Sequence, residues 1–208
     1  MCAALVASST GAAAQDAPAA HDAHEQTAAG ATRWVWTRDA NVFFGLNHQN
    51  RKFTDFTAWE SQNWFMLAGE RPAGPGQLSF RGMLSLEAFT LKDLGSPQVF
   101  QTGEAYRGGP LIDYQHPHDL LMQLGIGYRV ERPALAAEIE GDLVGSPALG
   151  PTPFMHRRSA RDNPQAPLTH HYLDATHITT GVIRGGITAN GITIESSLFR
   201  GRERTRTG

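Results

Sequence analysis

The stretch QLSFRGMLSLE, residues 77–87, decides the fold because its apolar residues recur at every second position. One face carries Leu78, Phe80, Gly82, Leu84 and Leu86, and the other carries Ser79, Arg81, Ser85 and Glu87. Successive side chains of a β-strand point to opposite faces, whereas an α-helix repeats every 3.6 residues. The stretch therefore predicts a strand with one apolar and one polar face.

The same alternation recurs along the chain. In residues 120–131 (LLMQLGIGYRVE), Met122, Leu124, Ile126, Tyr128 and Val130 alternate with polar residues or glycine. Residues 135–140 and 192–198 alternate in the same way, and residues 33–46, 59–70 and 176–188 are aromatic or β-branched but less regular. The sequence thus predicts an all-β domain with about seven strands.

Short and long connections alternate between these strands. Residues 72–76, 132–134 and 189–191 form tight turns, whereas residues 48–58, 92–119 and 145–175 are long connections. Short turns at one end and long loops at the other are typical of outer-membrane barrels. We therefore expect an antiparallel up-and-down transmembrane β-barrel. A soluble β-sandwich is the alternative prediction, because the mixed charges on the polar faces suit either a water-filled lumen or a face exposed to solvent.

Aromatic residues lie near the expected strand ends. Trp34, Trp36, Trp59, Phe89 and Tyr128 occupy such positions. In membrane barrels, girdles of aromatic residues mark the two interfaces between lipid and water. The positions are therefore consistent with the barrel prediction.

The chain of 208 residues divides into four expected regions. Residues 1–14 resemble a partial signal peptide that lacks a basic start, and the single cysteine, Cys2, would leave with it. Residues 15–32 are Ala-rich and expected to be disordered. Residues 33–203 form the barrel domain, and residues 204–208 resemble a non-native tail. Bacterial single-chain barrels have even strand numbers, so seven strands predict an incomplete barrel.

The overall composition restricts the class of protein. The formal charge is −2, from 18 basic and 20 acidic residues, which does not favour a nucleic-acid partner. Mean hydropathy is −0.33, and no apolar run is long enough for a helical span. The expected partners are outer-membrane lipid and a metal ion, and no protein partner can be inferred.

Histidines concentrate in or beside the three long connections. Seven of the nine histidines occur there: His48, His116, His118, His156, His170, His171 and His177. Histidine is the commonest metal ligand and titrates near neutral pH. The three connections should meet at one end of a barrel, so the sequence predicts a shared histidine-rich site.

Two stretches supply the candidate ligands. In DYQHPHD, residues 113–119, Pro117 favours an extended backbone that lets His116 and His118 approach one metal ion, with Asp113 or Asp119 as a ligand or its hydrogen-bond acceptor. The third long connection adds further candidates: His156, His170, His171, His177 and Asp174. Imidazoles with the nearby Met155 thioether favour copper, nickel or zinc over hard cations.

Two other interpretations of the histidines remain open. They could brace the loops through hydrogen bonds to the backbone or to carboxylates. Alternatively, Ser146 or Ser159 could form a catalytic triad with a loop histidine, as in a lipid-modifying barrel hydrolase. The sequence contains neither G-x-S-x-G nor H-E-x-x-H, so we expect metal binding or passage rather than catalysis.

Several motifs carry a family resemblance over about residues 33–203. They include QHPHDL (115–120), FMHR (154–157), HH (170–171) and DATHI (174–178). With these motifs the chain resembles a family of uncharacterised Gram-negative outer-membrane β-barrel-like proteins. The resemblance implies export to the cell outer membrane and a barrel fold, and it implies no particular activity. Relatives continue with further strands beyond residues 201–203, so the resemblance also implies a C-terminally truncated barrel.

Overall fold

The computed structural model describes residues 2–9, 33–51, 54–106, 108–168 and 170–201, without the side chains of residues 2–9, 101–105, 171 and 175. Three sequence-based predictions fall outside these residues: the disordered segment 15–32, the second half of the signal segment, and the tail 204–208.

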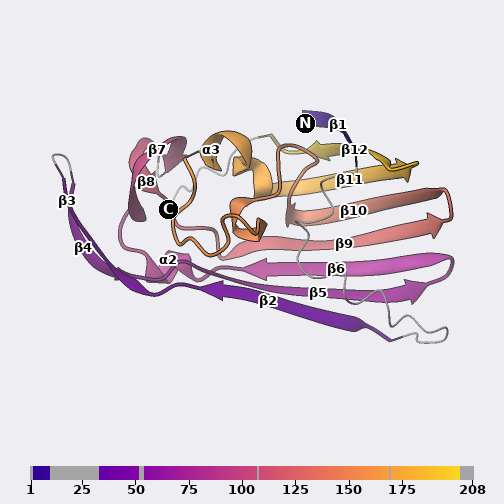
Figure 1. Cartoon of the computed structure of the whole chain (residues 1–208), viewed down its shortest axis with the longest axis horizontal. Helices are drawn as coiled ribbons and strands as arrows, with labels where there is room; N and C mark the ends of the chain where they lie inside the picture. Colours follow the sequence, from indigo (N-terminus) through magenta and orange to yellow (C-terminus); the bar gives the residue numbers. More distant parts are fainter. Residues whose placement is uncertain (1, 10–32, 52–53, 107, 169, 202–208) are drawn as a thin grey trace.

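An eight-stranded antiparallel sheet forms the body of the protein (Figure 1). Its strands, in spatial order, are β1 (Cys2–Ser9), β12 (Ile192–Phe199), β11 (Thr179–Ala189), β10 (Leu135–Gly145), β9 (Leu121–Arg132), β6 (Gly76–Leu84), β5 (Asn63–Ala73) and β2 (Val35–Val42). The all-β, antiparallel prediction is confirmed. Within the described part of the chain, the sheet keeps two free edges, at β1 and β2, and does not close. Residues 2–9 pair with β12, and their assignment to a signal peptide stays a prediction.

Two of the three long connections are β-hairpins, so their prediction as loops is wrong. Strands β3 (Gly45–Arg51) and β4 (Thr54–Glu60) form one hairpin, and β7 (Ser96–Tyr106) and β8 (Gly109–Gln115) form the other. Both lie at one end of the molecule, beyond the large sheet (Figure 1). Their backbone groups pair with each other, which satisfies them without the large sheet.

Short helical turns interrupt the remaining connections. They are α2 (Glu87–Thr90), η2 (Phe154–His156), α3 (His170–Leu173) and η3 (Ala175–His177). No helix in the described ranges is long and apolar enough to cross a membrane. At the opposite end of the sheet the turns are tight, as predicted: Asn190 and Gly191 both have positive φ, 51° and 75°.

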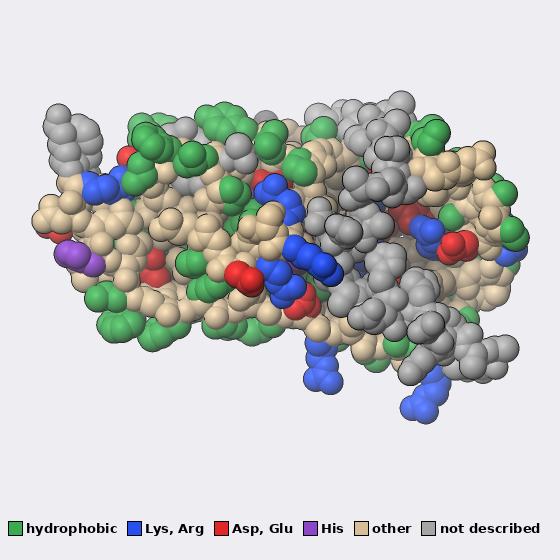
Figure 2. Space-filling view, viewed as in Figure 1, with side chains coloured by type: hydrophobic (Ala, Val, Ile, Leu, Met, Phe, Trp, Pro, Cys, Tyr) green, Lys and Arg blue, Asp and Glu red, His purple; other side chains and the backbone are tan. Residues whose placement is uncertain are grey.

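The two faces of the sheet differ in chemistry. Ile126 on β9 is 62% exposed and Ile139 on β10 is 57% exposed, and both belong to an apolar outward face. The inward face carries charged residues, among them Glu140, which pairs with both Arg81 and Arg184. Figure 2 shows hydrophobic side chains along the upper and lower margins of the molecule and charged side chains mainly between them.

An apolar cluster covers the inward face near the hairpin end. It consists of Trp64, Met83, Met122, Phe154, Met155 and Ala166. Met122 is only 2% exposed, although simple alternation places it on the outward face with Leu124. A register shift opposite Met83 and Leu84 inserts Met122 as an extra residue and turns it inward. The cluster anchors residues 154–166 over the sheet and so positions the histidines on either side of them.

Candidate metal centre

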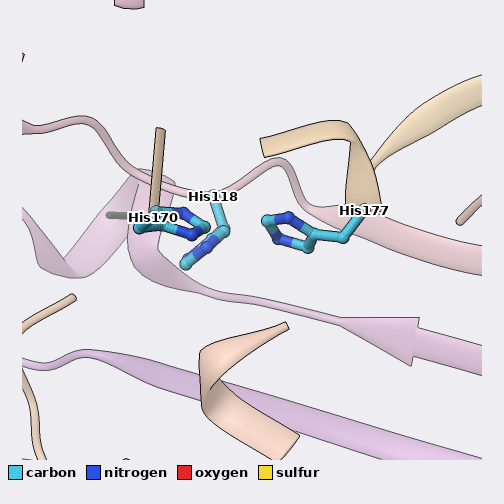
Figure 3. Close-up of side chains that lie close together, drawn as sticks. All are labelled: His118, His170 and His177. Carbon is cyan, nitrogen blue, oxygen red and sulfur yellow. The ribbon is translucent and has the colours of Figure 1, made fainter. Parts of the chain in front are cut away.

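Three histidines from distant parts of the sequence converge at the hairpin end. His118 precedes β9, His170 lies in α3 and His177 lies in η3 (Figure 3). One ring nitrogen of each lies within 4.8 Å of those of the other two. The ring centroids are 6.2 Å apart for His118 and His170, 5.7 Å for His118 and His177, and 5.2 Å for His170 and His177. We call these three residues the histidine cluster.

Glu87 orients His118. Its Oε2 atom accepts hydrogen bonds from Nδ1 of His118 at 2.8 Å and from the His118 backbone amide at 2.9 Å. Burial acts to raise the pKa of Glu87, but the charge that His118 carries when protonated and the hydrogen bonds from His118 and Asn63 outweigh burial and lower that pKa. The carboxylate is therefore ionised at neutral pH and can only accept, so Nδ1 of His118 carries the proton.

Asp174 orients the other two histidines. Its Oδ1 atom lies 2.6 Å from Nδ1 of His170, and its backbone oxygen lies 2.5 Å from Nδ1 of His177. The second carboxylate oxygen accepts from the Phe154 amide at 2.8 Å and from Arg157 at 3.1 Å. Asp174 is thus held in place while it fixes two rings.

These contacts select the tautomer of the histidine cluster. A carboxylate or carbonyl oxygen accepts the hydrogen bond from each Nδ1 atom, which leaves each Nε2 with a lone pair in the neutral ring. Nε2 of His118 and Nε2 of His177 are buried and have no hydrogen-bond partner in the described part of the chain. Neutral imidazoles with Nδ1 donated to an oxygen acceptor are the usual histidine ligands of zinc and related metals.

His177 is held in the neutral form that a metal requires. Burial lowers its pKa well below 6.5, and nearby His170 and His118 lower it further. The hydrogen bond to Asp174 opposes these effects without overcoming them. A metal ion at this position therefore displaces no proton from His177 at neutral pH.

Two histidines predicted as ligands lie outside the histidine cluster. His116 donates from Nδ1 to the Pro117 carbonyl at 2.8 Å, and its ring stacks on Tyr106 at 5.6 Å. His156 packs edge-on against Trp64 at 4.9 Å. His116 and His118 were expected to bind one metal ion together, but the structure places only His118 in the histidine cluster.

The remaining candidates also lie elsewhere. Asp113 pairs with Arg51 at 3.4 Å and accepts from the Phe100 amide at 2.8 Å. Asp119 is half-buried beside β9 and is not in the histidine cluster. His48 bonds Thr57 on the exposed β3–β4 hairpin. The side chain of His171 lies outside the described residues.

Sequence reasoning missed Glu87 as a functional residue. It was predicted on the polar face of a strand with Ser85, but β6 ends at Leu84 and Glu87 begins α2; both side chains are buried. A lone glutamate forms no motif, so only its place on the polar face of the predicted strand indicated an interior role.

Comparison with known proteins finds no family model, no curated protein and no solved structure that matches the chain.

Proposed function

We propose that the protein is an outer-membrane β-barrel protein that binds a transition-metal ion, such as copper, zinc or nickel, at His118, His170 and His177. One observation carries the metal proposal: each ring donates Nδ1 to an oxygen acceptor while ligand atoms of all three rings converge within 4.8 Å. Three histidines with one open position make a common zinc environment, and imidazole equally suits copper and nickel.

Loop bracing alone explains the geometry less well. The hydrogen bonds to Glu87 and Asp174 would brace the chain through Nδ1 wherever the Nε2 atoms pointed. If these histidines only braced the loops, the Nε2 atoms of His118 and His177 would stay buried without a partner, which is unfavourable. A bound ion removes that cost, which favours metal binding.

A serine hydrolase finds no support in the contacts. Ser146 donates from Oγ to the backbone oxygen of His177 at 3.0 Å rather than to an imidazole. Ser159, the other serine considered, is exposed on the connection that follows η2. The contact of Ser146 does not provide the base that activates a serine nucleophile.

The faces of the sheet support the membrane part of the proposal. An exposed apolar outward face with charges on the inward face is the arrangement of a transmembrane barrel and the reverse of a soluble sandwich. Stacked aromatic pairs lie near both ends of β2: Trp34 with Trp36 at 5.3 Å, and Phe44 with Trp59 at 5.1 Å. Such pairs fit the two interfacial girdles. Sheet closure and outer-membrane location, which the family resemblance implies, belong to the proposal.

Titration calorimetry of the full chain in detergent with Zn(II), Cu(II) and Ni(II) tests the metal site. We expect one ion per chain and a loss of affinity of about 100-fold or more in His118→Ala, since one of three ligands is gone. His116→Ala is the matched control, two residues away in the same motif, and should bind as the unsubstituted chain does. Unchanged binding in His118→Ala, or an equal loss in His116→Ala, would remove the proposal.

The barrel is tested separately. We expect the folded protein to migrate differently before and after boiling in detergent, as closed barrels do. A sheet that folds and stays monomeric in water without detergent would contradict the membrane assignment.

A further inference from the structure

A cavity lined by charged side chains lies beside the histidine cluster. It holds about 900 Å³ of empty space, part of it open to solvent. His177 and Asp174 belong to its wall on the loop side, and Arg81, Glu140, Asp142 and Arg184 belong to its wall on the sheet side. Any ligand in this cavity therefore meets a histidine of the cluster and the charged inward face of the sheet.

Most charges in the wall are matched. Arg81 approaches the two carboxylate oxygens of Glu140 at 3.0 and 3.1 Å, and Arg184 bonds the same carboxylate. Arg184 also lies 3.9 Å from Glu195. Two guanidinium groups thus balance two carboxylates. On the loop side, Asp174 is paired with Arg157 at 3.1 Å.

Asp142, on the sheet side of the wall, forms none of these ion pairs. It is 7% exposed, and its Oδ1 atom is buried with no hydrogen-bond partner in the described part of the chain. Burial and the charge of Glu140 raise the pKa of Asp142 to about 7, against the opposing charges of Arg184 and Arg81, because the ionised form is costly in this position. A cation in the cavity would offset that cost.

Two glycines make room for this side chain. A Cβ atom on Gly125 would lie 1.6 Å from Oδ1 of Asp142, and one on Gly145 would lie 2.6 Å from Oδ2. The neighbouring strand and the end of β10 are therefore shaped around the carboxylate. This fit indicates a built position for Asp142 rather than an accidental surface acid.

We propose that Asp142 binds a divalent metal ion, held by oxygen ligands, in the cavity that it shares with His177. We call this second metal site the cation station. Carboxylate, main-chain and water oxygens are the donors that hard divalent cations prefer, in contrast to the imidazoles of the histidine cluster. The inference rests on the proposed function for the neighbouring histidine cluster, whose transition-metal ion the hard cation at Asp142 would accompany rather than replace.

The test uses Mn(II), a hard cation, with the full chain in detergent after one equivalent of Zn(II) has been bound. Free Mn(II) is measured from its electron paramagnetic resonance signal. We expect one Mn(II) per chain and a loss of affinity of about tenfold or more in Asp142→Asn. Glu138→Gln is the matched control, because Glu138 lies on the same strand and face but pairs with Arg129 at 3.1 Å.

The outcomes separate the two proposals. Retained Zn(II) binding in Asp142→Asn shows that the variant folds, so a loss of Mn(II) then supports the cation station. Zn(II) binding without Mn(II) binding, or equal Mn(II) binding in Asp142→Asn, overturns the station and leaves the histidine site standing. Mn(II) binding that depends on Asp142 without Zn(II) binding overturns the histidine site and supports the station.

Discussion

One oxygen of Glu87 holds His118 twice, at 2.8 Å through the ring Nδ1 and at 2.9 Å through the backbone amide. Both the orientation of the ring and the path of the chain before β9 therefore depend on one buried carboxylate. Because Glu87 comes from α2 and His118 from a segment 31 residues later, the contact also joins two connections of the sheet.

Glu87→Gln should weaken metal binding without abolishing it. The amide keeps the shape of the side chain but removes the charge that supports the Nδ1 proton of His118. Loss of such an outer carboxylate typically costs 10- to 100-fold in metal affinity, so we expect about that reduction with one ion still bound. Calorimetry with Zn(II) measures it.

Glu60→Gln is the control for this prediction. Glu60 is equally buried, but it accepts from Ser96 at 2.9 Å and from Asn47 at 3.0 Å rather than from a histidine. A comparable loss of Zn(II) affinity in Glu60→Gln would show that general loosening, not the contact to His118, causes the effect.

His156 should make stability depend on pH. Burial lowers its pKa from 6.5 to about 4, with Arg161 adding to the shift and Asp39 opposing it. The unfolded chain therefore binds more protons between these values, so stability is complete above pH 6.5 and falls as the pH drops toward 4. The loss attributable to His156 should reach roughly 3 kcal/mol.

His156→Phe isolates that contribution. Phenylalanine keeps an aromatic ring against Trp64 and cannot bind a proton. Urea unfolding of both proteins at several pH values should show a smaller decline for the variant between pH 6.5 and 4. Parallel pH profiles would contradict the assignment to His156.

The strands were largely predictable because β10 and most of β6 and β9 alternate: Ile139 points outward and Glu140 inward. The hairpins were not, because their sequences do not alternate: β7–β8 buries the polar side chains of Ser96, Gln98 and Gln115. In β7–β8, Phe100 and Asp113 have positive φ, 67° and 59°, which breaks any periodic pattern. Local pattern also could not show the register shift at Met122.

The sequence could predict where the candidate site lies, but not which histidines form it. His118, His170 and His177 all belong to the predicted set, and the long connections do meet at one end. The spacing of His116 and His118 favoured them as a pair, yet the hydrogen bond of His116 to Pro117 and its stacking on Tyr106 turn it to other partners. Tertiary contacts of this kind leave no trace in spacing.

Lysine on the outward face should destabilise the protein in lipid. Ile126 and Ile139 point away from the charged interior, so Ile126→Lys or Ile139→Lys places a charge in the hydrocarbon layer of the proposed barrel. We expect a loss of about 2–4 kcal/mol near the bilayer midplane, measured by urea unfolding from lipid vesicles.

Gln123→Lys is the inward-facing control. Gln123 lines the charged cavity with Asp142, so an added lysine meets a carboxylate and water rather than lipid. Its unfolding free energy should change little. Equal effects of outward and inward lysines would indicate that the outward face does not contact lipid.

Gly125→Ala tests how tightly the sheet is built around Asp142. The new methyl group would lie 1.6 Å from Oδ1 and 2.7 Å from Cγ of Asp142, so the carboxylate must leave its position. Such overpacking typically costs about 1–3 kcal/mol, which chemical unfolding can measure.

Gly141→Ala is the matched control on the adjacent strand, since nothing lies within 4 Å of its Cβ position and alanine there should be neutral or slightly stabilising. In the Asp142→Ala background, Gly125→Ala should lose most of its cost, because the clashing carboxylate is gone. An unchanged cost in that background would mean that Asp142 does not occupy the space over Gly125, and the cation station would lose its geometric basis.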